Sequence, residues 1–141
     1  MCSSDLVVNA VAPQGAEAFI QAELLGRLGI TQYHWEHAIS GLPKSAAGSS
    51  ILSRDMVKFG QLILNKGRWQ GEQLIPEAYL ARALTPSRIN EHYGFFWWVD
   101  DFVVGTKTYH SFQGRGAGGQ FIFMFPELDL VVVVKIGRAH V

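Results

Sequence analysis

Four glycines within six residues, Gly114, Gly116, Gly118 and Gly119, are the strongest chemical signal in this sequence of 141 residues. They precede an apolar run, Phe121–Phe125, and therefore lie at the mouth of an expected strand. Glycine has no Cβ, so the backbone N–H groups there can approach a substrate carbonyl oxygen or a developing oxyanion. The residues alone leave two interpretations open: a set of backbone donors, or a glycine-rich turn with positive φ angles and no ligand. A phosphate-binding loop is disfavoured, because the glycines lead into a strand and not into a helix.

Side chains that carry out catalysis are not evident. The sequence contains no G-x-S-x-G, H-E-x-x-H, phosphate-loop or S-x-x-K pattern. His34 and His37 are three residues apart, but no cysteine or carboxylate pair completes a metal site of the usual ligand number. Asp100 and Asp101 are interpreted as a solvated turn. We therefore assign no catalytic side chain and expect neither a metal nor a cofactor.

The glycines must be positioned by the strands around them. Two apolar runs, Phe121–Phe125 and Leu130–Val134, are joined by the polar turn Pro126–Asp129, which predicts an antiparallel strand pair. Neither run alternates apolar with polar residues, so we expect the pair to be covered on both faces.

The rest of the chain changes from helical to extended patterns. Apolar residues at three- and four-residue intervals predict helices over 13–28, from Ser53 to a stop at Gly67, and over 76–84. Strands are expected over 93–99 and 108–113, with a turn-like segment over 100–107 between them. Residues 30–50 are expected to form a loop. Helices followed by antiparallel strands are typical of the α+β class.

Length and composition limit the function classes. The chain is long enough for one domain, and its formal net charge is zero, so nothing in it favours nucleic acid or an anionic membrane as a partner. No apolar stretch approaches the roughly 20 residues that a membrane-spanning helix needs. The oligomeric state is not assigned.

Both termini have the character of sequencing-adapter translations. Residues 136–141 match one reading frame of a common adapter, and residues 2–6 match its reverse complement. We therefore expect residues 1–6 and 136–141 to be non-native and residues 7–135 to be an internal portion of one domain. The only cysteine, Cys2, then lies outside that portion.

Three stretches resemble one enzyme family. Residues 52–62 with 65–69 (LSRDMVKFGQL…NKGRW) resemble its "ARDMAKFGQL…NGGRW" helix, and residues 93–98 (YGFFWW) resemble "YGYGWW", with Phe96 in place of the second glycine. Residues 116–130 are similar to its "GxGGQYIFVVPELDL" hairpin. The family is the β-lactamase and penicillin-binding-protein superfamily of serine hydrolases. The nearest resemblance is to its class C-like branch of esterases, D-aminopeptidases and 6-aminohexanoate-oligomer hydrolases.

The resemblance implies a β-lactamase/transpeptidase-like fold, in which helices cover both faces of an antiparallel sheet, here represented by its C-terminal part. It also implies acyl transfer to the serine of S-x-x-K, assisted by its lysine and by the tyrosine of Y-x-N. Both motifs would precede residue 7. The K-T-G position falls on Gly116–Gly118, and the N–H of Gly119 or Gln120 would be the oxyanion donor. Gly116, Gly118, Gly119 and Gln120 are therefore the expected oxyanion and substrate-binding residues.

The expected function follows from this resemblance. The parent protein would hydrolyse a small-molecule ester or amide through an acyl-serine intermediate, and the fragment alone would be inactive. The alternative is a penicillin-binding-like domain that binds or senses a ligand without turnover. A periplasmic or secreted location is compatible with the resemblance, but the sequence itself assigns no compartment. Arg115 stands beside a motif that lacks the usual lysine or histidine, and its role is left open.

Overall fold

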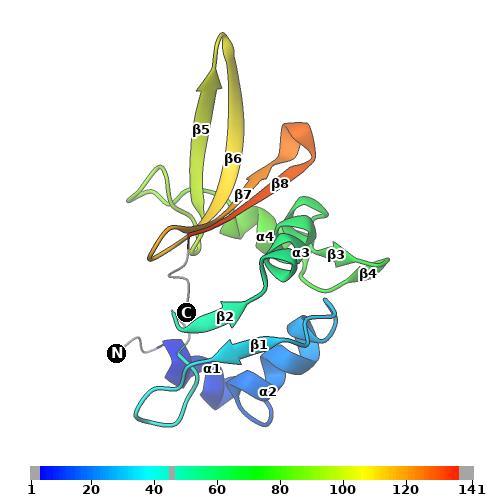
Figure 1. Ribbon diagram of the computed structural model, residues 1–141, viewed down its shortest axis with the longest axis vertical. Coiled ribbons are helices and arrows are strands. Elements are labelled where there is room, and N and C mark those ends of the chain that lie inside the picture. Colours follow the sequence, from blue (N-terminus) through cyan, green and yellow to red (C-terminus); the bar gives the residue numbers. More distant parts are fainter. Residues whose placement is uncertain (1–3, 45–46, 137–141) are drawn as a thin grey trace. The chain divides into compact units, whose positions relative to one another are not determined.

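The computed structural model describes residues 4–44 and 47–136. Residues 1–3 and 137–141, which belong to the two terminal segments expected to be adapter-derived, lie outside the described residues. The chain divides into two compact units, residues 1–52 and 53–141, and each is described by itself (Figure 1). Within the described residues, no helix is both long and apolar enough to cross a bilayer.

The first unit is mainly helical. Helix α1 spans Ser4–Val11, α2 spans Ala16–Ile20, and a π-helical turn continues α2 over Gln21–Leu25. The helix expected over 13–28 is thus confirmed over Ala16–Leu25, and a turn over residues 26–29 follows, with Gly29 at φ 63°. The buried core side chains of this unit include Ala16, Leu25, Leu28 and Ile30.

The expected loop over residues 30–50 contains one short antiparallel pair. Strand β1, Tyr33–Trp35, pairs with β2, Ser49–Ile51. The Tyr33 hydroxyl donates to the side-chain oxygen of Gln21, and the Trp35 indole N–H donates to the Lys44 carbonyl at 2.7 Å. Both aromatic residues therefore anchor this segment within the first unit.

The second unit contains the predicted helices and the sheet. Helix α3 spans Ser53–Leu64 and α4 spans Glu77–Ala83, with the hairpin of β3, Arg68–Trp69, and β4, Glu72–Gln73, between them. Four antiparallel strands follow in the order β5-β6-β7-β8. Their bounds are Trp98–Val104, Lys107–Gly116, Gln120–Phe125 and Leu130–Lys135. The hairpin predicted between the two apolar runs is β7–β8, closed by a 3₁₀ turn at Pro126–Leu128 and by Asp129 with φ 48°.

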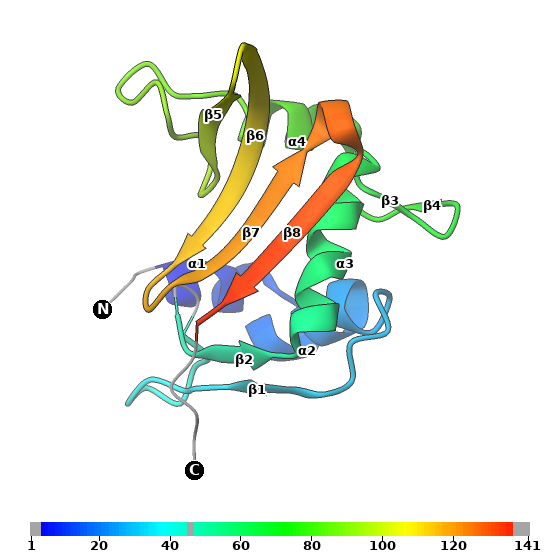
Figure 2. The same ribbon diagram turned by 45° about the horizontal axis from the view of Figure 1, so that its top comes forward.

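Helices α3 and α4 pack on the same face of this sheet, as Figure 2 shows for the four strands and α3. The centre of the core is Ile63 from α3, Leu80 from α4 and Met124 from β7, all at most 7% exposed. Phe112 and Val131 pair with Met124 across β6 and β8, so they project toward the helices as well. The strand register thus gives one helix-covered face.

The opposite face of the sheet is also apolar. The Phe102 ring lies edge-on to those of Phe123 and Phe125, with centroids 5.8 and 5.5 Å apart, and Phe121 stacks on Phe123. Apolar side chains on both faces explain why the two runs of the hairpin do not alternate in sequence. The architecture is α+β with an antiparallel sheet, as the sequence predicted. Within residues 53–136, however, the helices that pack on the sheet lie on one face, and Leu130 and Val132 on the other face are 42% and 36% exposed, so the expected cover on both faces is not found in this unit.

One strand differs from its prediction. The sequence predicted a strand over 93–99 and a turn over 100–107, whereas β5 spans Trp98–Val104 and turns only at Gly105 and Thr106. Asp100 and Asp101 are strand residues because each has a partner on β6. Asp101 Oδ1 lies 2.8 Å from His110 Nδ1, and Asp100 pairs with Arg115.

Candidate functional site

The glycine cluster forms the tip of the β6–β7 hairpin. Gly116 is the last residue of β6 and pairs with Gln120, the first residue of β7, so that 117–119 form the turn. Gly118 and Gly119 have φ angles of 83° and 81°. L-residues with a side chain are strained in this left-handed region, which explains the two consecutive glycines. The four site residues predicted from the sequence therefore lie within one hairpin tip.

The backbone of this tip is accessible on one side. A Cβ at Gly118 would meet no atom within 4 Å, whereas one at Gly119 would lie 3.3 Å from Cβ of Ile136. The Gly119 carbonyl accepts a hydrogen bond from the Ile136 N–H at 3.1 Å. In the turn hydrogen bonds that the structure describes for residues 4–44 and 47–136, neither Gly118 N–H nor Gly119 N–H is a donor. These turn hydrogen bonds thus occupy neither N–H group, and the space beside Gly118 is open, whereas Gly119 lies against Ile136.

A second set of backbone groups is exposed along β6. Strand β5 pairs with β6 only as far as Trp98 opposite Gln113, and the last three residues of β6 extend past its end. Phe96, with φ 65°, turns the chain away at this point. The two-residue β5–β6 turn makes Val104 and Lys107 a hydrogen-bonded pair, and alternation along β6 then directs the N–H and C=O of Arg115 toward the open side. Sequence reasoning missed this open edge, because it placed β5 five residues too early.

The Arg115 side chain is held on the sheet face opposite the helices. Its Nη2 donates to Asp100 Oδ2 at 2.8 Å, and its Nε donates to Gln113 Oε1 at 2.8 Å. The guanidinium carbon lies 4.7 Å from the centroid of the Trp98 ring, within the range of a cation–π contact. The buried Gln113 in turn donates from Nε2 to Ser111 Oγ at 2.7 Å. These contacts connect the start of β5 to the glycine end of β6.

The electrostatics of this network favour an ionised carboxylate. The hydrogen bond from Arg115, followed by the one from the Asp101 backbone N–H, lowers the pKa of Asp100 below its ordinary value. Because the guanidinium already has two polar partners and an aromatic neighbour, the structure shows Arg115 in a role that fixes strands. A role in gripping a substrate carboxylate would require it to leave these contacts.

The histidines considered for metal binding are separated in the first unit. His34 lies in β1, and His37 Nε2 is 2.9 Å from Glu17 Oε2. Among residues 4–44 and 47–136, no cluster of three or more His, Cys, Asp or Glu side chains is arranged to hold a metal ion. The chemistry that the described site offers is therefore hydrogen bonding from backbone groups.

Comparisons with known proteins identify relatives of this arrangement. The family model described as Beta-lactamase matches residues 5–140. A solved structure from Bacillus anthracis, described as "Putative 6-aminohexanoate-dimer hydrolase", superposes with a TM-score of 0.66 at 22% identity, over 81% of this chain and 30% of that one. Another, described as a "putative beta-lactamase" from Bacteroides dorei DSM 17855, gives a TM-score of 0.65 at 14% identity, over 89% of this chain and 46% of that one. The chain thus spans less than half the length of either structure. No curated protein gives a significant match.

Proposed function

The chain belongs to the Beta-lactamase family, and from that premise we propose that it is part of a serine hydrolase that cleaves an ester or amide through an acyl-serine intermediate. The observation that carries the proposal is the family match over residues 5–140. The substrate would be a small molecule with a carbonyl group open to nucleophilic attack.

The β6–β7 hairpin tip would supply part of the oxyanion site. In this proposal the N–H of Gly119, or that of Gln120, donates to the oxygen that becomes negatively charged, while Gly116 and Gly118 border the substrate. One such donor contributes on the order of 2.7–4 kcal/mol to transition-state stabilisation. The left-handed glycines and the open space at Gly118 support this role, because both bring bare backbone within reach of a ligand.

The catalytic serine would lie outside the chain. The sequence has no S-x-x-K, and by resemblance this motif and Y-x-N would stand before residue 7. We propose that residues 7–135 are the C-terminal portion of one catalytic domain, that the segments 1–6 and 136–141 are non-native, and that the fragment alone is inactive.

Two measurements test the proposal together. The purified chain of 141 residues is expected to hydrolyse a p-nitrophenyl ester no faster than a boiled sample, since its sequence lacks the S-x-x-K motif that would supply the nucleophile. A longer protein that includes the preceding sequence is expected to be labelled by a fluorescent phosphonate, and the label should map to the serine of S-x-x-K.

The control is the longer protein with that serine replaced by alanine, which should take no label. Hydrolysis by the purified chain above the boiled control would contradict its inactivity. A folded longer protein that binds ligands but takes no label would contradict the proposed hydrolase activity. It would favour a domain that binds or senses a ligand without turnover.

A further inference from the structure

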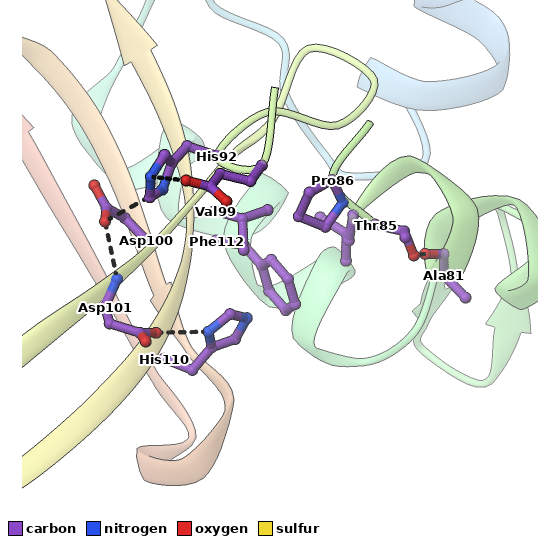
Figure 3. A pocket seen from close by; sticks show the side chains of 11 residues that line it. Ala81, Thr85, Pro86, His92, Val99, Asp100, Asp101, His110 and Phe112 are labelled. Carbon is purple, nitrogen blue, oxygen red and sulfur yellow. Dashed lines mark hydrogen bonds and ion pairs between the residues drawn. The ribbon is translucent and has the colours of Figure 1, made fainter. Parts of the chain in front are cut away.

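A cavity of about 560 Å³ lies on the helix-covered face of the sheet, between the segment that follows α4 and strands β5 and β6. Figure 3 shows the side chains that line it. Its apolar wall is built by Leu84 and Pro86 after α4 and by Val99 and Phe112 on paired positions of β5 and β6. Such a wall buries the body of a small ligand, while a few polar groups orient its head group.

The segment between α4 and β5 is fixed by backbone hydrogen bonds. The Val99 N–H donates to the His92 carbonyl at 2.9 Å, and the Phe95 N–H donates to the Ala83 carbonyl at 2.8 Å. The first bond holds the segment to β5 and the second holds it to α4. The cavity therefore has a defined shape in the folded chain.

The polar rim offers hydrogen-bond acceptors. Asp101 Oδ1 lies 2.8 Å from His110 Nδ1, so in the neutral ring Nδ1 carries the proton and Nε2 is an acceptor (Figure 3). The Thr85 hydroxyl, on another lining residue, donates to the Ala81 carbonyl at 2.8 Å, so its oxygen can still act as an acceptor. Glu91 adds a carboxylate that is 90% exposed.

The charges at the rim are negative. The described residues that line the cavity include Glu91, Asp100 and Asp101 but no lysine or arginine. Arg115 pairs with Asp100, so the charge available to a ligand comes mainly from Glu91 and Asp101. His92 Nε2 lies 3.7 Å from Glu91 Oε1, and His92 Nδ1 lies 3.8 Å from Asp100 Oδ1. Both distances are too long for a hydrogen bond.

We propose that this cavity binds a small organic cation, with a primary ammonium group on a short apolar body. An ammonium group has three N–H donors and no acceptor, which complements a rim of acceptors with net negative charge. The apolar body would lie against Val99 and Phe112. No residue of the glycine tip, residues 114–120, lines this cavity, and binding to it requires no hydrolysis.

The test uses the purified chain and three probes of similar shape. Calorimetric titration with 2-phenylethylammonium, 2-phenylethanol and 3-phenylpropanoate should give the tightest binding for the ammonium and the weakest for the carboxylate. Amide shifts in ¹H–¹⁵N spectra should concentrate at residues 99–101 and 110–112. Asp101→Asn should weaken ammonium binding about fivefold, the upper range for one solvent-exposed ion pair.

Matched variants make the outcome decisive. Glu91→Gln tests the rim at a side chain that is 90% exposed, so it does not depend on how well Asp101→Asn folds. Asp129→Asn removes the same charge from the β7–β8 turn, at a position with φ 48° that asparagine adopts readily, and should leave binding unchanged. Equal affinity for ammonium and alcohol, no binding of any probe, or equal weakening by Asp101→Asn and Asp129→Asn would overturn the proposal.

Discussion

Gly94 and Phe96 lie two residues apart in the segment before β5. The residue type suits the backbone position at Gly94 but not at Phe96. A Cβ at Gly94 would overlap the Ala83 carbonyl oxygen, so this position requires glycine. Phe96 has φ 65° and is 78% exposed, so its bulky side chain is strained in the left-handed region without being buried in return. The family pattern has glycine at this second position, and the backbone angle gives the physical reason.

Replacing Phe96 by glycine should therefore stabilise the chain. Relief of left-handed strain contributes about 1–2 kcal/mol, and the greater entropy of glycine in the unfolded chain offsets about 0.5–1 kcal/mol of it. Urea unfolding should show a net gain of up to about 1.5 kcal/mol. The control is Phe95→Gly, which should destabilise, since Phe95 contacts Tyr79 and Arg82. A loss of stability in Phe96→Gly would show that the ring contributes more than the backbone strain costs.

The Asp100–Arg115 pair gives a residue-scale pH dependence. The folded-state pKa of Asp100 lies below its unfolded value of about 3.9. The contribution of the ion pair to the free energy of unfolding is therefore complete above that pH and is lost as the pH falls through the folded-state pKa. The side chain is 42% exposed, which limits the contribution to at most about 1 kcal/mol.

Asp100→Asn should reduce the free energy of unfolding near pH 7 by at most about 1 kcal/mol. The difference from the unmodified chain should shrink below pH 4 and also in 1 M salt, because the pair is screened. Unfolding curves between pH 2.5 and 7 measure both effects, with Asp129→Asn as the control for a lost surface charge. A difference that stays constant with pH would contradict an ion pair as its source.

At the scale of elements, the seating of α3 on the sheet depends on Gly60. A Cβ there would lie 2.5 Å from Cγ1 of Val131 and 3.3 Å from Cγ2 of Ile122. The absence of a side chain lets the helix approach β7 and β8 closely. Because valine has stiff χ1 preferences, it does not move aside without cost.

Gly60→Ala should destabilise the chain despite the better helix propensity of alanine. Overpacking costs about 1–3 kcal/mol, and the propensity gain offsets about 1 kcal/mol. The double variant Gly60→Ala/Val131→Ala should recover part of the loss, so a double-mutant cycle against Val131→Ala alone should give a favourable coupling energy. Strict additivity would mean that the two positions do not constrain each other.

Local sequence signals predicted some elements well and one poorly. Helix α3 was predicted because Asp55 lies in its first turn, Met56, Phe59, Leu62 and Ile63 share one face, and Gly67 follows its end. Strand β5 was misplaced because two adjacent aspartates favour a turn when their neighbours in sequence alone are considered. Their partners, His110 and Arg115, are supplied by a different strand, and local patterns do not contain that information.

At the scale of the whole molecule, three sequence motifs carry the resemblance to the family, whereas the hydrophobic periodicity indicates only the α+β class. The glycine tip was predicted as one cluster, and the structure brings Gly116, Gly118, Gly119 and Gln120 together in one turn. Their role as donors stays a prediction, since the residues that would complete the reaction are not in this sequence. The open edge beside Arg115 was not predicted, because it depends on where β5 ends relative to β6.

The strand order β5-β6-β7-β8 also bears on how the sheet forms. Every strand pairs with its neighbour in sequence, and the connecting turns are only a few residues long. The entropy lost on closing such short loops is small, so each hairpin can form before the next strand joins. A sheet with this order has the low contact order that is associated with rapid folding.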